Sequence, residues 1–157
     1  RRHRKSTGRS LMARLSDTLP GTWRLLSRID VTASGERRPE PMLGEDPEAL
    51  LIYDRNGHFA AQFMRRDRSV DIPDVAVAGP NNSRAQGGYD AYFGSYKIDD
   101  ATSSVTQTLT GALSRESVGM VLTRQMEVSG DSLIIRLETR TADGTPVTRT
   151  LTWERVG

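Results

Sequence analysis

Gly21-Thr22-Trp23 opens the first apolar run of the chain, and Leu151-Thr152-Trp153 lies in the last one. Each end of the 157-residue chain therefore places a tryptophan in a strand-like segment. A closed β-barrel brings its first and last strands side by side, where one wide aromatic side chain from each can fill the space between them. The two tryptophans thus indicate a closed barrel.

Between these two segments the chain alternates apolar and polar residues in short runs separated by turn-forming residues. A period of two is typical of β-strands. We expect eight of them, over 22–31, 49–54, 58–65, 91–98, 104–111, 119–128, 132–139 and 146–156. The predicted fold is all-β, an eight-stranded antiparallel up-and-down β-barrel with a short N-terminal helix over 10–18.

The connections support up-and-down topology. Asp54-Arg55-Asn56-Gly57, Ser129-Gly130-Asp131 and Asp143-Gly144 each predict a tight hairpin, because Asn-Gly and Asp-Gly tolerate the positive φ that such turns require. The exception is the long segment 66–90, which is rich in Asp, Pro, Asn and Gly. A loop of that length is typically a lid, a binding loop or disordered.

Charge divides the chain unevenly. Residues 1–14 hold six basic residues and no acidic one, which leaves 16 basic against 20 acidic residues in the remainder. We therefore predict a basic leader over 1–18, disordered or forming the short helix with Ser10 as its cap, and a barrel domain over 19–157. Because the body carries no basic stripe with stacking aromatics, we do not expect nucleic-acid binding.

Composition narrows the chemistry further. The chain has no cysteine, and His58 is its only histidine outside the leader, so we expect neither a disulfide nor a metal site. There is no glycine-rich phosphate loop, and we expect no cofactor. No run approaches the ~18 apolar residues of a membrane span, and the leader lacks the apolar segment of a secretory signal. A cytoplasmic protein without membrane contact is the expectation.

Several short motifs occur in the order found in one family. They are Gly21-Thr22-Trp23, Gly44-Glu45-Asp46-Pro47, Asn56-Gly57-His58-Phe59, Gln62-Phe63-Met64-Arg65, Ala91-Tyr92-Phe93-Gly94 and Leu151-Thr152-Trp153. The run from about 19 to 156 thereby resembles the bacterial and fungal lipocalin-like domain proteins. This resemblance implies an eight-stranded cup that binds a ligand. Most members of the family have no assigned activity, so it implies no reaction.

Alternation sorts the side chains into lumen and exterior. In the first strand we place Trp23, Leu25, Ser27 and Ile29 inside, with Arg24, Arg28 and Asp30 outside. Two later strands put arginines among apolar neighbours, as follows: Leu122, Arg124 and Met126 in one, and Val147, Arg149, Leu151, Trp153 and Arg155 in the other. An arginine in such a position needs a partner, because an unpaired buried charge is costly.

The candidate site residues each have two interpretations. Arg124 either braces the barrel floor, by stacking on Trp23 or bonding backbone carbonyls, or anchors a ligand carboxylate, enolate or phenolate. Arg149 has the same two interpretations. Tyr92 and Tyr96 either belong to the aromatic core or offer a hydroxyl to a ligand.

For the predicted strand over 58–65, the sequence does not decide which face points into the lumen. His58 and Gln62 line the lumen in one register and face solvent in the other, where Phe59, Ala61 and Phe63 point inward. His58 is thus either a solvated residue near the rim or a proton-transfer group. The candidate ligand-binding residues are Trp23, His58, Gln62, Tyr92, Tyr96, Arg124, Arg149 and Trp153.

Three functions compete. The favoured one is a carrier or sensor that binds a small hydrophobic or amphipathic molecule in the cup, with a homodimer left open. The second is a cofactor-free isomerase or cyclase acting on a polyketide-like molecule, in which Arg124 and Tyr96 stabilise an enolate and His58 moves a proton. The third is a barrel filled by its own side chains that acts as an interaction module. A cavity well below ~300 Å³ would favour this third function.

Overall fold

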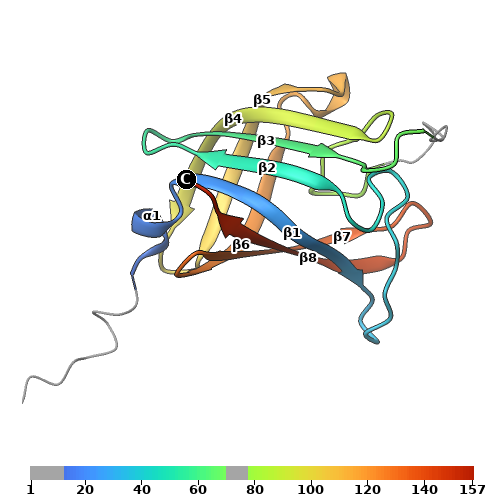
Figure 1. Cartoon of the computed structure of the whole chain (residues 1–157), viewed down its shortest axis with the longest axis horizontal. Coiled ribbons are helices and arrows are strands. Elements are labelled where there is room, and N and C mark those ends of the chain that lie inside the picture. Colours follow the sequence, from blue (N-terminus) through green and yellow to red (C-terminus); the bar gives the residue numbers. More distant parts are fainter. Residues whose placement is uncertain (1–12, 70–77) are drawn as a thin grey trace, which may run out of the picture.

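The structure, a computed structural model, describes residues 13–69 and 78–157, and its strands form one closed barrel (Figure 1). Each strand pairs antiparallel with the next, and β1 pairs with β8. The strands are β1 (Gly21–Val31), β2 (Glu48–Tyr53), β3 (His58–Met64), β4 (Tyr89–Asp99), β5 (Ser104–Ala112), β6 (Val121–Ser129), β7 (Ser132–Arg140) and β8 (Pro146–Arg155). The predicted eight-stranded up-and-down barrel is confirmed.

The hairpin turns lie where the sequence predicts them. Gly57, Gly130 and Gly144 have φ values of 89°, 59° and 87°, in the left-handed region that glycine adopts most readily. They connect β2 to β3, β6 to β7 and β7 to β8. Local turn chemistry thus fixes three of the connections of the barrel.

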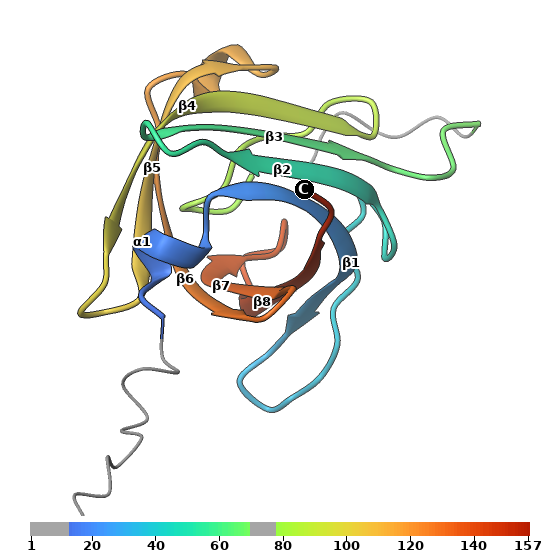
Figure 2. The same ribbon diagram turned by 60° about the vertical axis from the view of Figure 1, so that its left-hand side comes forward.

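The two ends of the barrel differ (Figures 1 and 2). At one end, which we call the floor, helix α1 (Leu15–Thr18) lies beside the C-terminal residues, and Ser16 bonds Asp100 through its backbone N (2.9 Å) and its hydroxyl (2.7 Å). At the other end, which we call the mouth, lie the β1–β2 loop, the described parts of the β3–β4 loop and the β7–β8 turn. Helix α1 is shorter than predicted, and the expected cap Ser10 lies outside the described residues.

The predicted inward face of β1 is wrong beyond its middle. A β-bulge between Leu25 and Ser27 shifts the register against β8. Because a bulge inserts one residue, the side chains after it exchange faces. Arg28 and Asp30 are therefore buried, at 8% and 6% exposure. The bulge brings two charged side chains into the lumen near the mouth.

Candidate functional site

A cavity of about 90 Å³ lies in the mouth half of the lumen. Its apolar wall includes Leu51, Phe63, Ile135, Leu137, Leu151 and Trp153. Its polar wall includes Arg28, Asp30, Glu40, Ser83, Asp90, Tyr92, Gln107, Arg124 and Arg149. The rest of the lumen is packed with core side chains, among them Trp23, Leu109, Leu122 and Leu133. The site is thus small, with an apolar side and a strongly charged side.

Arg149 and Asp30 form a buried two-point ion pair. Nε of Arg149 donates to Oδ1 of Asp30 at 2.8 Å, and Nη2 donates to Oδ2 at 2.9 Å. The two side chains are 6% and 4% exposed. Parallel bonds of this kind fix both groups in one geometry. Arg149, predicted as a brace or an anchor, therefore has a carboxylate partner within the chain.

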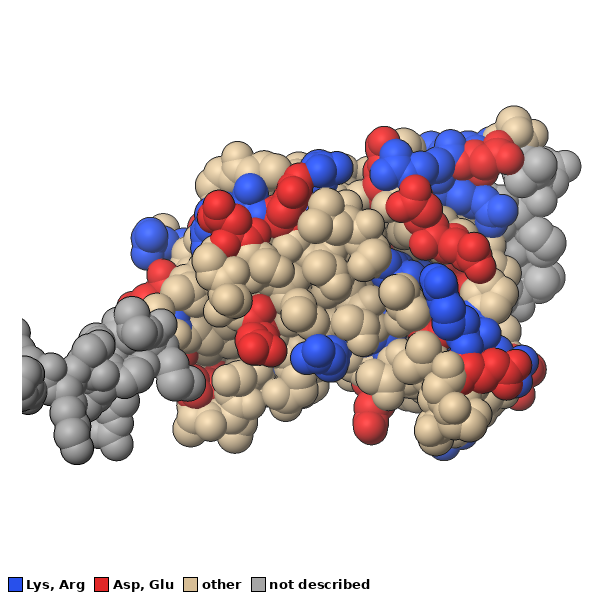
Figure 3. Space-filling model, turned by 60° about the horizontal axis from the view of Figure 1, so that its bottom comes forward, with Lys and Arg blue, Asp and Glu red and all other residues tan. Residues whose placement is uncertain are grey.

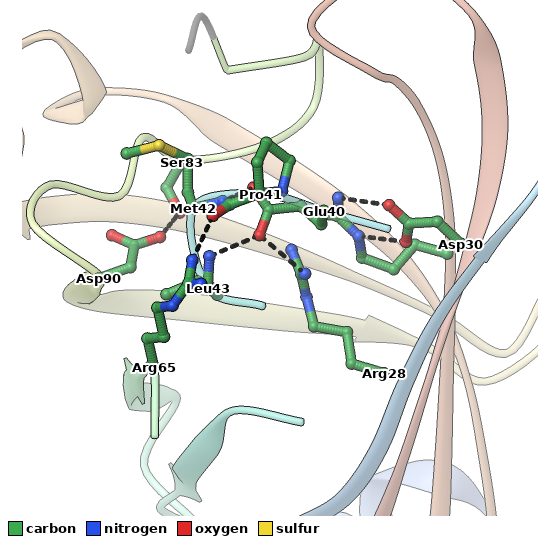
Figure 4. Close-up of polar contacts among 10 residues, drawn as sticks. Arg28, Asp30, Glu40, Pro41, Met42, Leu43, Arg65, Ser83 and Asp90 are labelled. Carbon is green, nitrogen blue, oxygen red and sulfur yellow. Dashed lines mark hydrogen bonds and ion pairs between the residues drawn. The ribbon is translucent and has the colours of Figure 1, made fainter. Parts of the chain in front are cut away.

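Glu40 holds the β1–β2 loop over the mouth (Figure 4). Its carboxylate accepts bonds from the backbone N of Met42 (2.9 Å) and of Leu43 (2.7 Å), and from Nη1 of Arg28 (3.2 Å). Met42 and Leu43 are both buried, at 6% and 5% exposure. Burial, followed by repulsion from Arg149, lowers the pKa of Arg28 to about 10. The loop is thus anchored by a second, partly buried ion pair.

Arg124 differs from Arg28 and Arg149, the other two buried arginines of the cavity wall. Its Nη1 donates to the backbone O of Asn81 (2.9 Å) and of Thr123 (3.1 Å). Within residues 13–69 and 78–157, no carboxylate lies within ion-pair distance of its guanidinium. Burial lowers the pKa of Arg124, while Tyr92 and Tyr53 raise it. Arg124 is a buried cation held by neutral oxygens.

Tyr92 lies beside Arg124 in the cavity wall. Burial raises the pKa of Tyr92 to about 12, against the lowering effects of Arg124, Arg28 and a hydrogen bond with Ser83. The hydroxyl of Ser83 also donates to Oδ2 of Asp90 at 2.5 Å. A group of polar side chains therefore runs from Asp90 through Ser83 and Tyr92 to Arg124.

The other predicted tyrosine lies closer to the floor. The hydroxyl of Tyr96 donates to the backbone O of Asp54 in the β2–β3 turn. Tyr96 is not part of the cavity wall. Its ring packs edge-on against Tyr53, with centroids 4.9 Å apart, and the Tyr53 hydroxyl donates to Gln107 at 2.5 Å. The structure thus places Tyr92 in the cavity wall and Tyr96 in the aromatic core.

His58 and Gln62 lie on the outer face of β3. Phe59, Ala61 and Phe63 are buried instead, which settles the register that the sequence leaves open. The His58 side chain is 69% exposed, and its Nδ1 lies 3.1 Å from Oδ2 of Asp54. Neither residue belongs to the cavity wall. The alternation of β3 points both side chains away from the lumen, so the structure does not bring them to the cavity, and their role in ligand binding stays a prediction.

The stacking on Trp23 considered for Arg124 is made by Arg155 instead. The guanidinium of Arg155 lies 4.2 Å from the ring centroid of Trp23 and donates to the backbone O of Pro20 and Thr18. Trp23 is fully buried at the floor and donates to the backbone O of Leu19 at 3.0 Å. Trp23 therefore lies outside the cavity wall, whereas Trp153 is part of it.

Other kinds of site were also considered. Among the described residues, no group of three or more His, Cys, Asp or Glu side chains is arranged to bind a metal ion. Over the same residues, no helix is long and apolar enough to cross a membrane. On the face shown in Figure 3, acidic and basic side chains lie next to one another over much of the charged area.

Sequence reasoning missed Asp30, Arg28, Glu40 and Asp90. The bulge that turns the first two inward carries no glycine or proline signal. Asp90 was detectable, since β4 begins at Tyr89 and Asp90 has the parity of Tyr92. Part of the 66–90 loop, predicted as a lid, binding loop or disordered segment, lies outside the described residues, but its residues 82–85 line the cavity.

Comparison with protein families gives one match. A family model described as a lipocalin-like domain matches residues 20–156. The matched range includes every strand of the barrel. A comparison with curated proteins gives no match.

Proposed function

The chain belongs to the lipocalin-like domain family, and on that premise we propose that it is a carrier or sensor for a small amphipathic molecule. The anionic group of this molecule binds Arg124, and its apolar part packs against the Trp153 side of the cavity. The observation that carries the proposal is the buried guanidinium of Arg124, which has no carboxylate partner among the described residues. A buried charge is costly unless it is paired.

The other two buried arginines of the cavity wall support this assignment by contrast. Arg28 and Arg149 each have a carboxylate of the chain at 3.2 Å or closer. Arg124 has two backbone oxygens and the Tyr92 hydroxyl instead. A planar guanidinium binds carboxylates through two parallel bonds, so a ligand anion would supply what the chain supplies to the other two.

Cavity size limits the ligand. A volume of about 90 Å³ is well below the roughly 300 Å³ of ordinary ligand pockets. It exceeds the roughly 10–15 Å³ that one water needs, and an apolar cavity of ~150 Å³ accommodates benzene. The ligand is therefore small, and the cyclase function on a polyketide-like substrate is not favoured by this volume.

The small volume favours one other function. In this function the barrel's own side chains fill the lumen, the remaining cavity binds no ligand, and the protein is an interaction module. Arg124 then acts only as a brace that bonds the backbone of Asn81 and Thr123. The two functions predict different effects of losing Arg124. A ligand-binding role predicts weaker ligand binding, whereas a bracing role leaves the affinity unchanged.

The test compares two arginines that both donate to backbone carbonyls. Arg124→Leu removes the cavity cation, and Arg155→Leu removes the floor cation as a control. Native mass spectrometry of each purified protein detects retained small molecules, and NMR titration with butanoate measures affinity. We expect Arg124→Leu to weaken butanoate binding about tenfold or more, because hydrogen bonds to charged groups contribute about 1.5–3 kcal/mol.

Arg155→Leu should bind butanoate like the unmodified protein, although it lowers the melting temperature. Equal butanoate affinity for all three proteins would establish Arg124 as a brace. Absence of binding to the unmodified protein, with no retained molecule, would favour the filled barrel.

A further inference from the structure

Two residues of the cavity wall each carry a buried polar atom that has no hydrogen-bond partner in the part of the chain that the structure describes. The two atoms are Oδ1 of Asp90 and Nε1 of Trp153. The two residues are only 5% and 1% exposed. Buried polar groups are almost always hydrogen-bonded, so each exception calls for an explanation. A ligand in this cavity would provide one explanation for both.

Asp90 and Trp153 are both neighbours of Phe63. Asp90 pairs directly with Phe63 in the β3–β4 ladder. Side chains at such paired positions lie about 4.5–5.5 Å apart at Cβ. The Trp153 ring meets the Phe63 ring edge-on, with centroids 5.8 Å apart and an angle of 74°. Phe63 itself lines the cavity. A small ligand packed over Phe63 would therefore lie next to both side chains.

Asp90 is also connected to the anion-binding group. Oδ2 of Asp90 is taken by the Ser83 hydroxyl (Figure 4), and Ser83 and Arg124 both interact with the Tyr92 hydroxyl. Burial raises the pKa of Asp90, although the hydrogen bonds from Ser83 and from the backbone of Ala91 oppose that effect. Arg124 and Asp90 are therefore two poles of opposite charge in one cavity, connected by two hydroxyls.

The chemistry of the two atoms selects the group that fits them. A carboxylate oxygen needs a donor, and an indole N–H needs an acceptor. A hydroxyl does both at once, whereas an ammonium only donates and a carbonyl only accepts. An ammonium would also lie in a wall whose buried side chains include three arginines, namely Arg28, Arg124 and Arg149. A hydroxyl is therefore the group that completes the hydrogen bonding of this wall.

We infer that the ligand is a small hydroxycarboxylic acid. Its carboxylate binds Arg124, and its hydroxyl donates to Asp90 and accepts from Nε1 of Trp153. Rotation of the Asp90 carboxylate is soft, because its terminal torsion has broad minima, so its free oxygen can turn toward the hydroxyl. This inference rests on the proposed function, since it uses the same anion-binding arginine.

The test uses four-carbon acids of matched skeleton: butanoate, its 2-, 3- and 4-hydroxy forms and the corresponding amino forms. NMR titration gives the affinity of each acid for the unmodified protein, Trp153→Phe and Asp90→Ala. Trp153→Phe removes the indole N–H and keeps an aromatic ring. Trp23→Phe is the matched control, because the Trp23 N–H already bonds Leu19 at the floor.

We expect at least one hydroxybutanoate to bind the unmodified protein about tenfold more tightly than butanoate, as two hydrogen bonds to otherwise unpaired groups permit. This advantage should fall below about twofold in Trp153→Phe and persist in Trp23→Phe. Where Asp90→Ala folds, it should show the same loss. The advantage is the ratio of hydroxybutanoate to butanoate affinity within each variant, so a general change in the cavity wall does not count as a loss. Only Trp23→Phe, which lies outside the cavity wall, should bind butanoate like the unmodified protein.

Other results overturn the inference. Equal binding of butanoate and all its hydroxy forms would overturn it and leave the proposed function intact. An advantage that survives in Trp153→Phe, or a greater advantage for an amino form, would have the same effect. Absence of binding for every acid would overturn both this inference and the proposed function.

Discussion

The floor and the cavity each contain a buried tryptophan and an arginine that bonds backbone carbonyls, but their hydrogen bonding differs. At the floor, the Trp23 N–H bonds Leu19, and Arg155 covers the Trp23 ring while bonding two backbone carbonyls. In the cavity wall, the Trp153 N–H has no partner in the described chain, and Arg124 has no carboxylate there. The floor thus completes its own hydrogen bonds, and the proposed ligand would complete those of the cavity.

The charged side chains inside the barrel are also distributed unevenly between its two ends. The ion pairs Arg149–Asp30 and Arg28–Glu40 both lie at the mouth, on the wall of the cavity. Buried ion pairs contribute little net stability compared with apolar residues of similar volume. Their presence at the mouth therefore indicates that this end positions groups, whereas the floor provides stability.

The largest expected effect tests the floor. Trp23→Ala should lower the free energy of unfolding by about 4 kcal/mol, because it leaves a large cavity in a fully buried part of the core. Urea denaturation measures this change. Leu26→Ala is the control, since Leu26 is 46% exposed on the same strand and should have little effect. A loss below about 1 kcal/mol would show that Trp23 does not hold the floor closed.

The next effect tests the mouth. Asp30→Asn should destabilise the protein by about 3 kcal/mol, because it leaves the Arg149 guanidinium buried without its charge partner. Replacing both residues together, as Asp30→Leu with Arg149→Met, should restore most of the stability. Urea denaturation of the single and double variants measures both. A double variant as unstable as the single one would mean that the pair stabilises the barrel and would remove the contrast with the floor.

Most of the barrel is predictable from local signals. Turn residues such as Asn56-Gly57 set hairpin positions, and the alternation around Arg124 and Arg149 gives their faces correctly, since Leu122, Met126 and Leu151 are buried with them. Both signals act over a few residues. The lipocalin-like resemblance extends the same conclusion to the whole barrel and is confirmed by the match over 20–156.

The site is less predictable because it depends on register and on loops. The bulge after Leu25 reverses the faces of Arg28 and Asp30, and nothing in the local sequence marks it. Glu40 lies in a loop without periodicity, and its place over the mouth follows from its contacts with Arg28 and the backbone. Of the predicted set, Tyr92, Arg124, Arg149 and Trp153 line the cavity, whereas Trp23, His58, Gln62 and Tyr96 do not.

The smallest expected effect is a change in how the stability of the protein depends on pH, and it tests the burial of Tyr92 in the cavity wall. Tyr92 has its pKa raised from 10.0 to about 12, with burial as the main cause. Between these values the folded protein keeps a proton that the unfolded chain loses, so stability falls as pH rises from 10 to 12. The contribution is complete below pH 10 and amounts to about 2 kcal/mol over the interval.

Tyr92→Phe has no group to titrate at this position, so its stability should decline less steeply above pH 10 than that of the unmodified protein. Urea denaturation at intervals from pH 8 to 11.5 measures both slopes, and comparing the two proteins cancels the opposite contribution of Arg28, whose pKa is lowered to about 10. Parallel curves above pH 10 would mean that water reaches the Tyr92 hydroxyl freely. The mouth would then be an open rim, and the buried polar wall on which the ligand site depends would not exist.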